Sequence, residues 1–311
     1  MTWGTDRRSV LTGLGALGVA GCGPAPSDQV ASEAPADTRP MAIWEPSPFQ
    51  TLDFSELESR NGGRIGFAAL RAGERPLVWR VDERFVYCST FKMYLAAATL
   101  LRVQAGHERL DRAIPITRAD MLNHAPTTEP AIGSTLTVQQ LMQGTVELSD
   151  NPAANILIRE MGGLDALRAF YRGIGDDSTR VDRLEPEMNR LDGDKDTISP
   201  LQSVANIRHL LVDADTPLSP ASKTLLTRWM IDTPTGQGRI KAGVPAGWTV
   251  AHKTGTGGYG PTNDIGVLTP PSGDPVVMAV YYHADRSSSS DQNEAVIAEA
   301  TRLALKALGH D

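Results

Sequence analysis

The sequence predicts an α/β fold of the α+β type, with strands at both ends of the folded body and helices between them. Apolar, strand-like segments come early, at residues 63–70 and 76–85, and return late, at residues 249–253, 264–268 and 276–282. The long stretch between these groups shows hydrophobic residues at helical spacing. A chain of 311 residues, 41% of them hydrophobic, can bury a large core in one or two closely joined units.

The first residues predict a targeting segment. Arg7 and Arg8 precede an apolar run at residues 10–20, which is too short to span a bilayer as a helix. This layout is typical of a signal peptide over residues 1–21. The paired arginines indicate the twin-arginine route, and the general export route is the alternative.

The end of this segment, Val19-Ala20-Gly21-Cys22, resembles the lipobox of bacterial lipoproteins. The resemblance implies cleavage before Cys22 and acylation of that residue, so that the exported protein is anchored to a membrane, in the periplasm or at the cell surface. Each buried methylene of such an anchor contributes about 0.8 kcal/mol. A plain signal peptide with an incidental cysteine is the alternative. Residues 22–47, rich in Pro, Ala, Ser and Asp, predict a flexible tether to the folded domain at residues 48–311.

Within the folded domain, the two early strands are joined by the turn-forming sequence Gly-Glu-Arg-Pro at residues 73–76. The run at residues 89–103 is apolar on nearly every face, which predicts a helix buried at the centre. An amphipathic helix at residues 291–308 closes the chain. The other predicted helices occupy residues 136–146, 153–161, 164–172, 199–211 and 220–230.

Composition excludes several kinds of partner. The formal net charge is −7, and no run of Lys and Arg is interleaved with aromatic residues, so a nucleic-acid partner is not expected. No His and acidic residues fall at metal-ligand spacing such as H-E-x-x-H, so neither a metal site nor zinc-dependent hydrolysis is expected. The prediction is a monomer without a cofactor that acts on a small molecule.

Three short motifs occur once each and in a fixed order: Ser89-Thr90-Phe91-Lys92, Ser149-Asp150-Asn151 and Lys253-Thr254-Gly255. S-x-x-K is expected about once by chance in a chain of this length, but S-D-N and K-T-G only about 0.05 to 0.1 times each. The ordered set has a chance probability on the order of one in a thousand or less. The motifs therefore predict a chemical function.

Ser89 and Lys92 have the spacing that an activated serine needs. A serine hydroxyl is a poor nucleophile at neutral pH and requires a base and donors aimed at the developing oxyanion. Lys92 lies one helical turn after Ser89 on the same face, so its amine is expected to touch the Ser89 oxygen. Burial and positive charge from Lys253 would lower the pKa of Lys92 enough for it to act as a base.

Together with Glu185-Pro186-Glu187-Met188-Asn189, these motifs resemble those of the class A serine β-lactamases, from about residue 46 to the C-terminus. The resemblance implies an antiparallel sheet flanked by helices, with an all-helical subdomain inserted at about residues 88–230 and the cleft at their junction. It makes residues 48–311 the catalytic domain. The implied reaction is hydrolysis of the β-lactam amide of penicillins or cephalosporins through an acyl-enzyme on Ser89.

The resemblance also implies roles for the catalytic residues. Glu185, with Asn189, would activate the water that hydrolyses the Ser89 ester, and the bond between Glu185 and Pro186 is expected to be cis. An ion pair between Arg183 and Asp196 would hold the ends of this loop. Whether Lys92 or Glu185 is the acylation base stays open.

The resemblance also implies which residues contact the substrate. Ser149, held by Lys253, would pass a proton to the lactam nitrogen, and Lys253 would also supply charge for the substrate carboxylate. Asn151 would bind the amide of the substrate side chain, and Thr254 would offer a hydroxyl. The backbone N–H groups of Ser89 and Thr256 would form the oxyanion hole.

Some positions vary within the family. Thr262 stands where many members carry an arginine, and Arg239 matches the alternative arginine position, so Arg239 is expected to meet the substrate carboxylate. His124 falls at the expected rim of the cleft, or else is a solvated loop residue. Cys88 precedes the nucleophile, but Gly257 occupies the position of its possible partner, so no internal disulfide is expected.

Two alternatives share part of this pattern. A D-alanyl-D-alanine peptidase or penicillin-binding protein carries the same serine, lysine and K-T-G motifs. The presence of Glu185 and Asn189 argues against this alternative. A non-catalytic β-lactam sensor would acylate and then stall, and no signalling segment supports that interpretation.

Overall fold

The structure is a computed structural model that describes residues 49–258, 260–284 and 288–310. The predicted signal peptide, Cys22 and the whole of the predicted tether at residues 22–47 lie outside these described residues. No helix within the described ranges has the length and apolar character needed to cross a membrane.

The folded body is built around a six-stranded sheet, with the strand order β1-β3-β2-β10-β9-β8. The central pairing of β2 with β10 joins the two ends of the chain, as the early and late strands predicted. All pairs in this sheet are antiparallel except β1 with β3, which are parallel. The strands are β1 Gln50–Thr51, β2 Arg64–Arg71, β3 Leu77–Trp79, β8 Thr249–Thr256, β9 Pro261–Thr269 and β10 Val276–His283.

The prediction of one continuous strand at residues 76–85 was wrong. β3 ends at Trp79, and Arg80 adopts a left-handed φ of 44° that turns the chain away from the sheet. Its guanidinium binds the Glu58 carboxylate, with Nε 2.8 Å from Oε1, so a long-range ion pair decides a bend that strand propensity does not reveal. The chain resumes as β4 (Phe85–Val86), which pairs with β7 (Thr197–Ile198) in a separate two-stranded sheet.

The predicted helices are all present, with ends shifted by a few residues. The central helix α2 is buried over residues 91–100, which confirms the prediction from its uniformly apolar sequence. The helices are α1 Ser55–Asn61, α2 Phe91–Gln104, α3 Val138–Glu147, α4 Asn151–Met161, α5 Leu164–Gly173, α6 Pro200–Leu211, α7 Pro220–Asp232, α8 Ile240–Gly243 and α9 Ser290–Ala307. Short 3-10 turns lie at Cys88–Thr90, Arg118–Asp120, Glu129–Ala131 and Glu187–Asn189, and a small hairpin joins β5 (Ala113–Pro115) to β6 (Thr135–Thr137).

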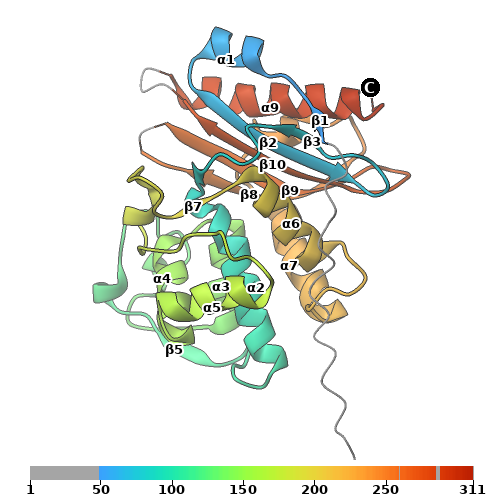
Figure 1. Ribbon diagram of the computed structural model, residues 1–311. Coiled ribbons are helices and arrows are strands. Elements are labelled where there is room, and N and C mark those ends of the chain that lie inside the picture. The colour runs from blue at the N-terminus through green and yellow to red at the C-terminus, as the bar shows by residue number, and fades with distance from the viewer. Residues whose placement is uncertain (1–48, 259, 285–287, 311) are drawn as a thin grey trace, which may run out of the picture. The chain divides into compact units, whose positions relative to one another are not determined.

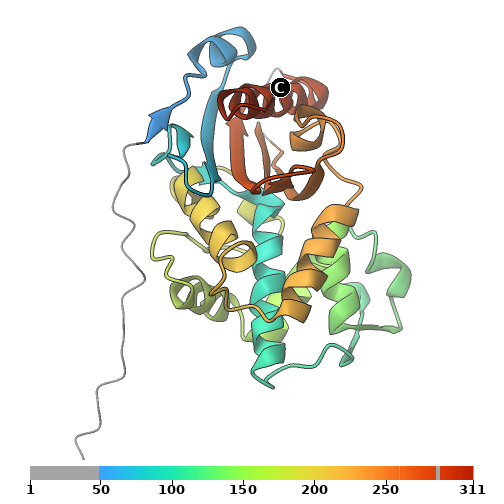
Figure 2. The same ribbon diagram turned by 90° about the vertical axis from the view of Figure 1, so that its right-hand side faces the viewer.

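The two faces of the large sheet are covered differently. Helices α1 and α9 lie on one face, and α6 lies on the other, where α2 to α5 and α7 extend away from the sheet (Figures 1 and 2). Each face buries its own hydrophobic cluster. Helix α7 and the turn at Cys88–Thr90 contact the edge strand β8, and the motif residues come together at this edge.

Candidate active site

A cleft of about 630 Å³ opens beside strand β8. Its lining includes eight of the residues that the sequence singled out, namely Ser89, His124, Ser149, Asn151, Asn189, Arg239, Thr254 and Thr256. The other three, Lys92, Glu185 and Lys253, are 0%, 2% and 0% exposed. A larger cavity of about 960 Å³ lies beside α7, and none of these residues lines it.

Ser89 sits in the 3-10 turn Cys88–Thr90, directly before α2. Cys88 has a left-handed φ of 48°, and the N–H of Thr90 donates to the Tyr87 carbonyl at 3.2 Å, so the chain turns sharply into the helix. Ser89 is 8% exposed and lines the cleft. The turn thus brings the Ser89 side chain to the cleft while the first turns of the helix behind it stay buried.

Lys92 is fully buried behind Ser89. The predicted hydrogen bond between its amine and the Ser89 oxygen is not found. Within the described part of the chain, Lys92 Nζ lies 3.0 Å from Glu185 Oε1 and donates to Asn151 Oδ1 at 2.6 Å and to the Ser149 carbonyl at 2.8 Å. These oxygens come from segments far along the chain, at residues 149–151 and 185, and Glu185 Oε1 also accepts from the Ser89 hydroxyl. The prediction that Lys92 lies on the same side as Ser89 was correct, because both contact Glu185 Oε1. The prediction that its amine bonds to Ser89 was wrong.

Burial lowers the pKa of Lys92, and the Glu185 carboxylate opposes this shift. Burial also lowers the pKa of Lys253 well below its ordinary value, and the charge of Lys92 adds to that effect. Lys253 Nζ donates to Ser149 Oγ at 3.2 Å, which agrees with the predicted support of Ser149 by Lys253. The two buried amines therefore share the Ser149 region and disfavour each other's charge.

Ser149 is placed by the start of α4. The Asp150 side chain caps this helix by accepting from the Ala153 N–H at 2.8 Å, and it also binds the backbone of Thr127 and Thr128. Ser149 takes a left-handed φ of 59° just before the cap. The S-D-N motif is thus both a helix start and a wall of the cleft.

Glu185 is the buried carboxylate closest to the nucleophile. Ser89 Oγ donates to Glu185 Oε1 at 3.3 Å, and Asn189 Nδ2 donates to Glu185 Oε2. The bond between Glu185 and Pro186 is cis, as expected. Asn155 on α4 clamps the main chain of Glu185, because its amide oxygen accepts from Glu185 N at 3.0 Å and its Nδ2 donates to Glu185 O at 2.9 Å.

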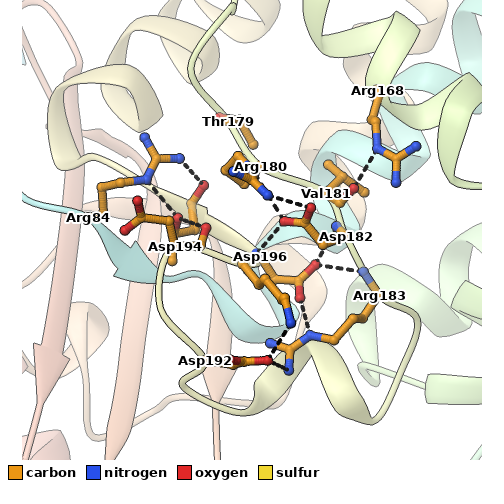
Figure 3. Close-up of polar contacts among 12 residues, drawn as sticks. Arg84, Arg168, Thr179, Arg180, Val181, Asp182, Arg183, Asp192, Asp194 and Asp196 are labelled. Atoms are coloured by element: carbon orange, nitrogen blue, oxygen red, sulfur yellow. Dashed lines mark hydrogen bonds and ion pairs between the residues drawn. The ribbon is translucent and has the colours of Figure 1, made fainter.

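The loop that carries Glu185 is held by an ion-pair network (Figure 3). Arg183 Nε lies 2.6 Å from Asp196 Oδ2, which confirms the predicted pair. Asp196 is fully buried and also accepts from the backbone N–H groups of Asp182 and Arg183 at 2.7 and 3.0 Å. Arg183 further contacts Asp192, with 3.5 Å between Nη1 and Oδ2. These contacts tie the two ends of the loop together.

Arg239 reaches the cleft from the segment before α8. Its guanidinium donates to the carbonyls of Gly255 and Asn263 at 3.1 and 2.9 Å and to Thr256 Oγ1 at 2.8 Å. Thr256 is paired with Thr262 across strands β8 and β9. Arg239 therefore contacts the pair of strands β8 and β9 beside Thr262, and its predicted contact with the substrate carboxylate stays a prediction.

The remaining predicted substrate residues also surround the cleft. Asn151 accepts a hydrogen bond from the Lys92 amine at Oδ1, and its Nδ2 donates to the Asn123 carbonyl at 3.0 Å. Thr254 Oγ1 lies 2.9 Å from Thr235 Oγ1. His124 has a left-handed φ of 58°, and its Nε2 lies 2.8 Å from the Leu148 carbonyl. It is an exposed loop residue that also lines the cleft, so both interpretations agree with its position.

Cys88 is a free, buried thiol, and burial raises its pKa. A Cβ added to Gly257 would lie 3.2 Å from Cys88 Sγ, so Gly257 does stand opposite the thiol. Among the described residues, His209, Asp213 and Asp215 bring ligand atoms close enough for a metal ion, but none of them lines the cleft.

Sequence reasoning missed several residues of the site. Asn155 follows Asn151 by one helical turn on α4, and this spacing was the available signal. Glu294, whose Oε1 lies 3.1 Å from Arg239 Nε, lines the cleft from α9, where it is one of several acidic residues on an amphipathic helix. No sequence pattern marked Thr235, which lines the cleft, because its contact is a long-range hydrogen bond between its hydroxyl and that of Thr254.

Comparison with known proteins agrees with this geometry. A sequence model of the Beta-lactamase enzyme family matches residues 51–308. The chain is 40% identical to the carbapenem-hydrolyzing β-lactamase KPC of Klebsiella oxytoca, over 82% of this chain and 88% of that protein. It is 38% identical to a β-lactamase of Bacillus licheniformis, over 82% and 83%. The solved structure of an ancestral (GNCA) class A β-lactamase is similar with a TM-score of 0.78 and 47% identity, over 82% of this chain and 98% of that one. The chain therefore belongs to the β-lactamase enzyme family, and it is a class A serine β-lactamase.

Proposed function

We propose that this protein hydrolyses the β-lactam amide of penicillins and cephalosporins through an acyl-enzyme on Ser89. The observation that carries the proposal is the position of Glu185. It is a buried carboxylate in contact with the Ser89 hydroxyl and with the Asn189 amide. A site that holds such a base beside the nucleophile can release its acyl group as well as form it.

In the acylation step, Ser89 Oγ attacks the lactam carbonyl carbon and loses its proton to the buried pair of Lys92 and Glu185. The backbone N–H groups of Ser89 and Thr256 receive the developing oxyanion. Ser149 then gives its proton to the lactam nitrogen as the C–N bond breaks, and Lys92, whose Nζ lies 3.5 Å from Ser149 Oγ, passes the proton taken from Ser89 on to Ser149. This transfer leaves Glu185 as a free carboxylate for the next step, and Lys253 holds Ser149 in place through its 3.2 Å hydrogen bond. This leaves an ester on Ser89 and an opened ring.

In the deacylation step, Glu185 takes a proton from a water molecule, which attacks the ester carbonyl. Asn189 orients the water together with Glu185, and the cleavage of the ester returns the proton to Ser89. Asn155 and the contact between Arg183 and Asp196 keep the carboxylate in place for this step. A base fixed in this way is typically worth about 10²- to 10⁴-fold in rate.

The substrate carboxylate binds in this proposal beside Lys253, Thr254 and Arg239, and the substrate's side-chain amide binds at Asn151. Arg239 and Thr254 line the cleft on its sheet side, and Asn151 lines the opposite, helical side. This arrangement suits an elongated substrate with an anionic group at one end.

We further propose that the protein is exported and anchored to a membrane through an acylated Cys22, in the periplasm or at the cell surface, and that it acts as a monomer. The support is the order of paired arginines, apolar run and Val-Ala-Gly-Cys in the first residues.

Hydrolysis of a chromogenic cephalosporin by residues 48–311 tests the function. Turnover should be lost in Ser89→Ala, because the ester can no longer form. A protein that acylates without turning over would be a penicillin-binding protein or a sensor. A protein that cleaves D-alanyl-D-alanine peptides and leaves β-lactams intact would be a peptidase.

A further inference from the structure

A buried histidine and a buried aspartate lie behind the substrate-facing edge of the sheet. His252 on β8 and Asp264 on β9 are both 0% exposed, and His252 Nδ1 lies 2.9 Å from each carboxylate oxygen of Asp264. His252 precedes Lys253 in the chain, yet its side chain has no part in the proposed reaction. A charged group is costly to bury, so this pair requires an explanation.

Asp264 holds the start of the segment that carries Arg239. Its Oδ2 accepts from the N–H of Ile240 at 3.2 Å, and Ile240 is the first residue of α8. Arg239 is the preceding residue, at the N-cap position, and no side chain of its own segment caps the helix. Because α8 has only 4 residues, it cannot fix its own start, and the Asp264 carboxylate does so.

His252 lies near the other end of the same segment. A Cβ added to Gly236 would lie 2.3 Å from Thr254 Cγ2, 3.2 Å from His252 Cε1 and 3.6 Å from Arg239 Cδ. Gly236 has a left-handed φ of 67° and lines the cleft. Together with Thr254, the imidazole therefore leaves no room for a side chain at the turn that leads into Arg239. Asp264 contacts residue 240, and His252 lies close to residue 236.

We infer that His252 and Asp264 are positioning residues, which hold residues 236–240 so that the Arg239 guanidinium faces the carboxylate of the substrate. The inference rests on the proposed role of Arg239. His252 supplies a donor to Asp264 from Nδ1, and its ring lies near Gly236 beside the Thr254 side chain. Its Nε2 has no hydrogen-bond partner among the described residues, so Nδ1 is the nitrogen through which the ring acts.

The same carboxylate also acts on the second cation of the carboxylate site. Burial lowers the pKa of Lys253 well below its ordinary value, and the Asp264 carboxylate opposes this shift. Asp264 is paired with Thr254 across β8 and β9, next to Lys253. The pair thus supports both groups that are proposed to attract the substrate's negative charge.

The test compares a chromogenic cephalosporin with its carboxylate methyl ester, which cannot use a carboxylate site. His252→Leu should lower kcat/KM for the free acid by about 10-fold, mainly through KM, and should leave kcat/KM for the ester within about 2-fold. His252→Asn should restore most of the loss, because Asn Nδ2 can occupy the place of His Nδ1. Arg239→Ala serves as the reference for loss of the carboxylate contact.

The control is His283→Asn on β10, a half-buried histidine whose Nε2 also has no partner among the described residues. This variant should leave kcat/KM unchanged for both the free acid and the methyl ester. If His252→Leu lowers kcat/KM equally for acid and ester, or changes neither, the positioning inference is wrong. If Arg239→Ala itself fails to separate acid from ester, the proposed role of Arg239 fails instead.

Circular dichroism and thermal unfolding establish whether each variant is folded. Should His252→Leu not fold, Asp264→Asn replaces it, because the asparagine can still accept from Ile240 N while it removes the charge. This variant should lower kcat/KM for the acid by more than for the ester. Equal effects on the two substrates would overturn the inference.

Discussion

Lys92 Nζ and Glu185 Oε1 lie 3.0 Å apart, and both side chains are 0% exposed. A buried ion pair seldom adds to stability, because the cost of removing two charges from water is comparable to their attraction. The same carboxylate accepts a hydrogen bond from the Ser89 hydroxyl. The pair is therefore best explained by a role in the reaction, since it places an amine and a carboxylate next to the Ser89 hydroxyl.

Glu185→Ala should trap the acyl-enzyme. The change removes the carboxylate that activates water and leaves Ser89 and the oxyanion donors in place, so deacylation should slow by about 10²- to 10⁴-fold. Mass spectrometry after brief mixing with a penicillin should show the adduct persisting on the variant and largely absent from the wild type. Turnover of the variant at the wild-type rate would exclude Glu185 as the deacylating base.

Acylation of the same variant should depend on pH through Lys92. Burial lowers the pKa of this amine from 10.5 and Glu185 raises it, so removal of Glu185 should lower the pKa further. The free amine, which is the basic form, becomes more abundant as pH rises through that pKa. The acylation rate should therefore rise with pH and level off below the ordinary pKa of lysine. Rapid-mixing measurements from about pH 5 to about pH 9 test this, and a flat profile would argue against Lys92 as the base.

Arg183→Ala should destabilise the loop that carries Glu185. Asp196 is fully buried and would lose its guanidinium partner, which should cost about 1–3 kcal/mol in free energy of unfolding. Deacylation should slow as well, because the carboxylate is less well placed. The matched control is Arg180→Ala, whose pair with Asp182 is partly exposed (48% and 22%) and should contribute about 0–1 kcal/mol. Equal destabilisation in the two variants would contradict the assigned role of the Arg183 contact.

Arg239→Ala should lower kcat/KM toward penicillins and cephalosporins by about 10- to 100-fold, which is roughly 1.5 to 3 kcal/mol for a hydrogen bond to a charged group. Arg239→Lys should recover only part of this, because lysine keeps the charge and loses the two-pronged geometry. Steady-state kinetics provide the measurement. Unchanged efficiency in Arg239→Ala would mean that another residue holds the carboxylate.

Cys22→Ser should abolish labelling of the full chain by a radioactive fatty acid and should block normal processing. The reason is that the thioether-linked lipid needs the cysteine sulfur. Labelling during growth, followed by electrophoresis and autoradiography, is the measurement. Equal labelling of both proteins would rule out Cys22 as the lipid attachment site.

Much of the fold could be predicted from local sequence. The buried helix α2, the helix α4 and the late strands depend on hydrophobic spacing and on contacts between near neighbours. The predicted strand at residues 76–85 failed because Arg80 binds Glu58, which is 22 residues away. Local propensity contains no information about such a partner.

By itself, the sequence determined which residue types the site contains and in what order, since Ser89, Lys92, Ser149, Glu185 and Lys253 stand out as motifs. It also determined the side of α2 that Lys92 shares with Ser89, because helical geometry sets that relationship. Only the tertiary structure decided what each group touches.

Lys92 bonds to Glu185 rather than to Ser89, and Asp264 reaches Ile240 beside Arg239. Arg239 in turn meets Thr256 at the edge of the sheet. These contacts join residues that are far apart in the chain, so they form only when the sheet and the helical layer come together. The physical reason is that a hydrogen-bond partner is selected by distance and burial in space, and the packing of separate elements sets both.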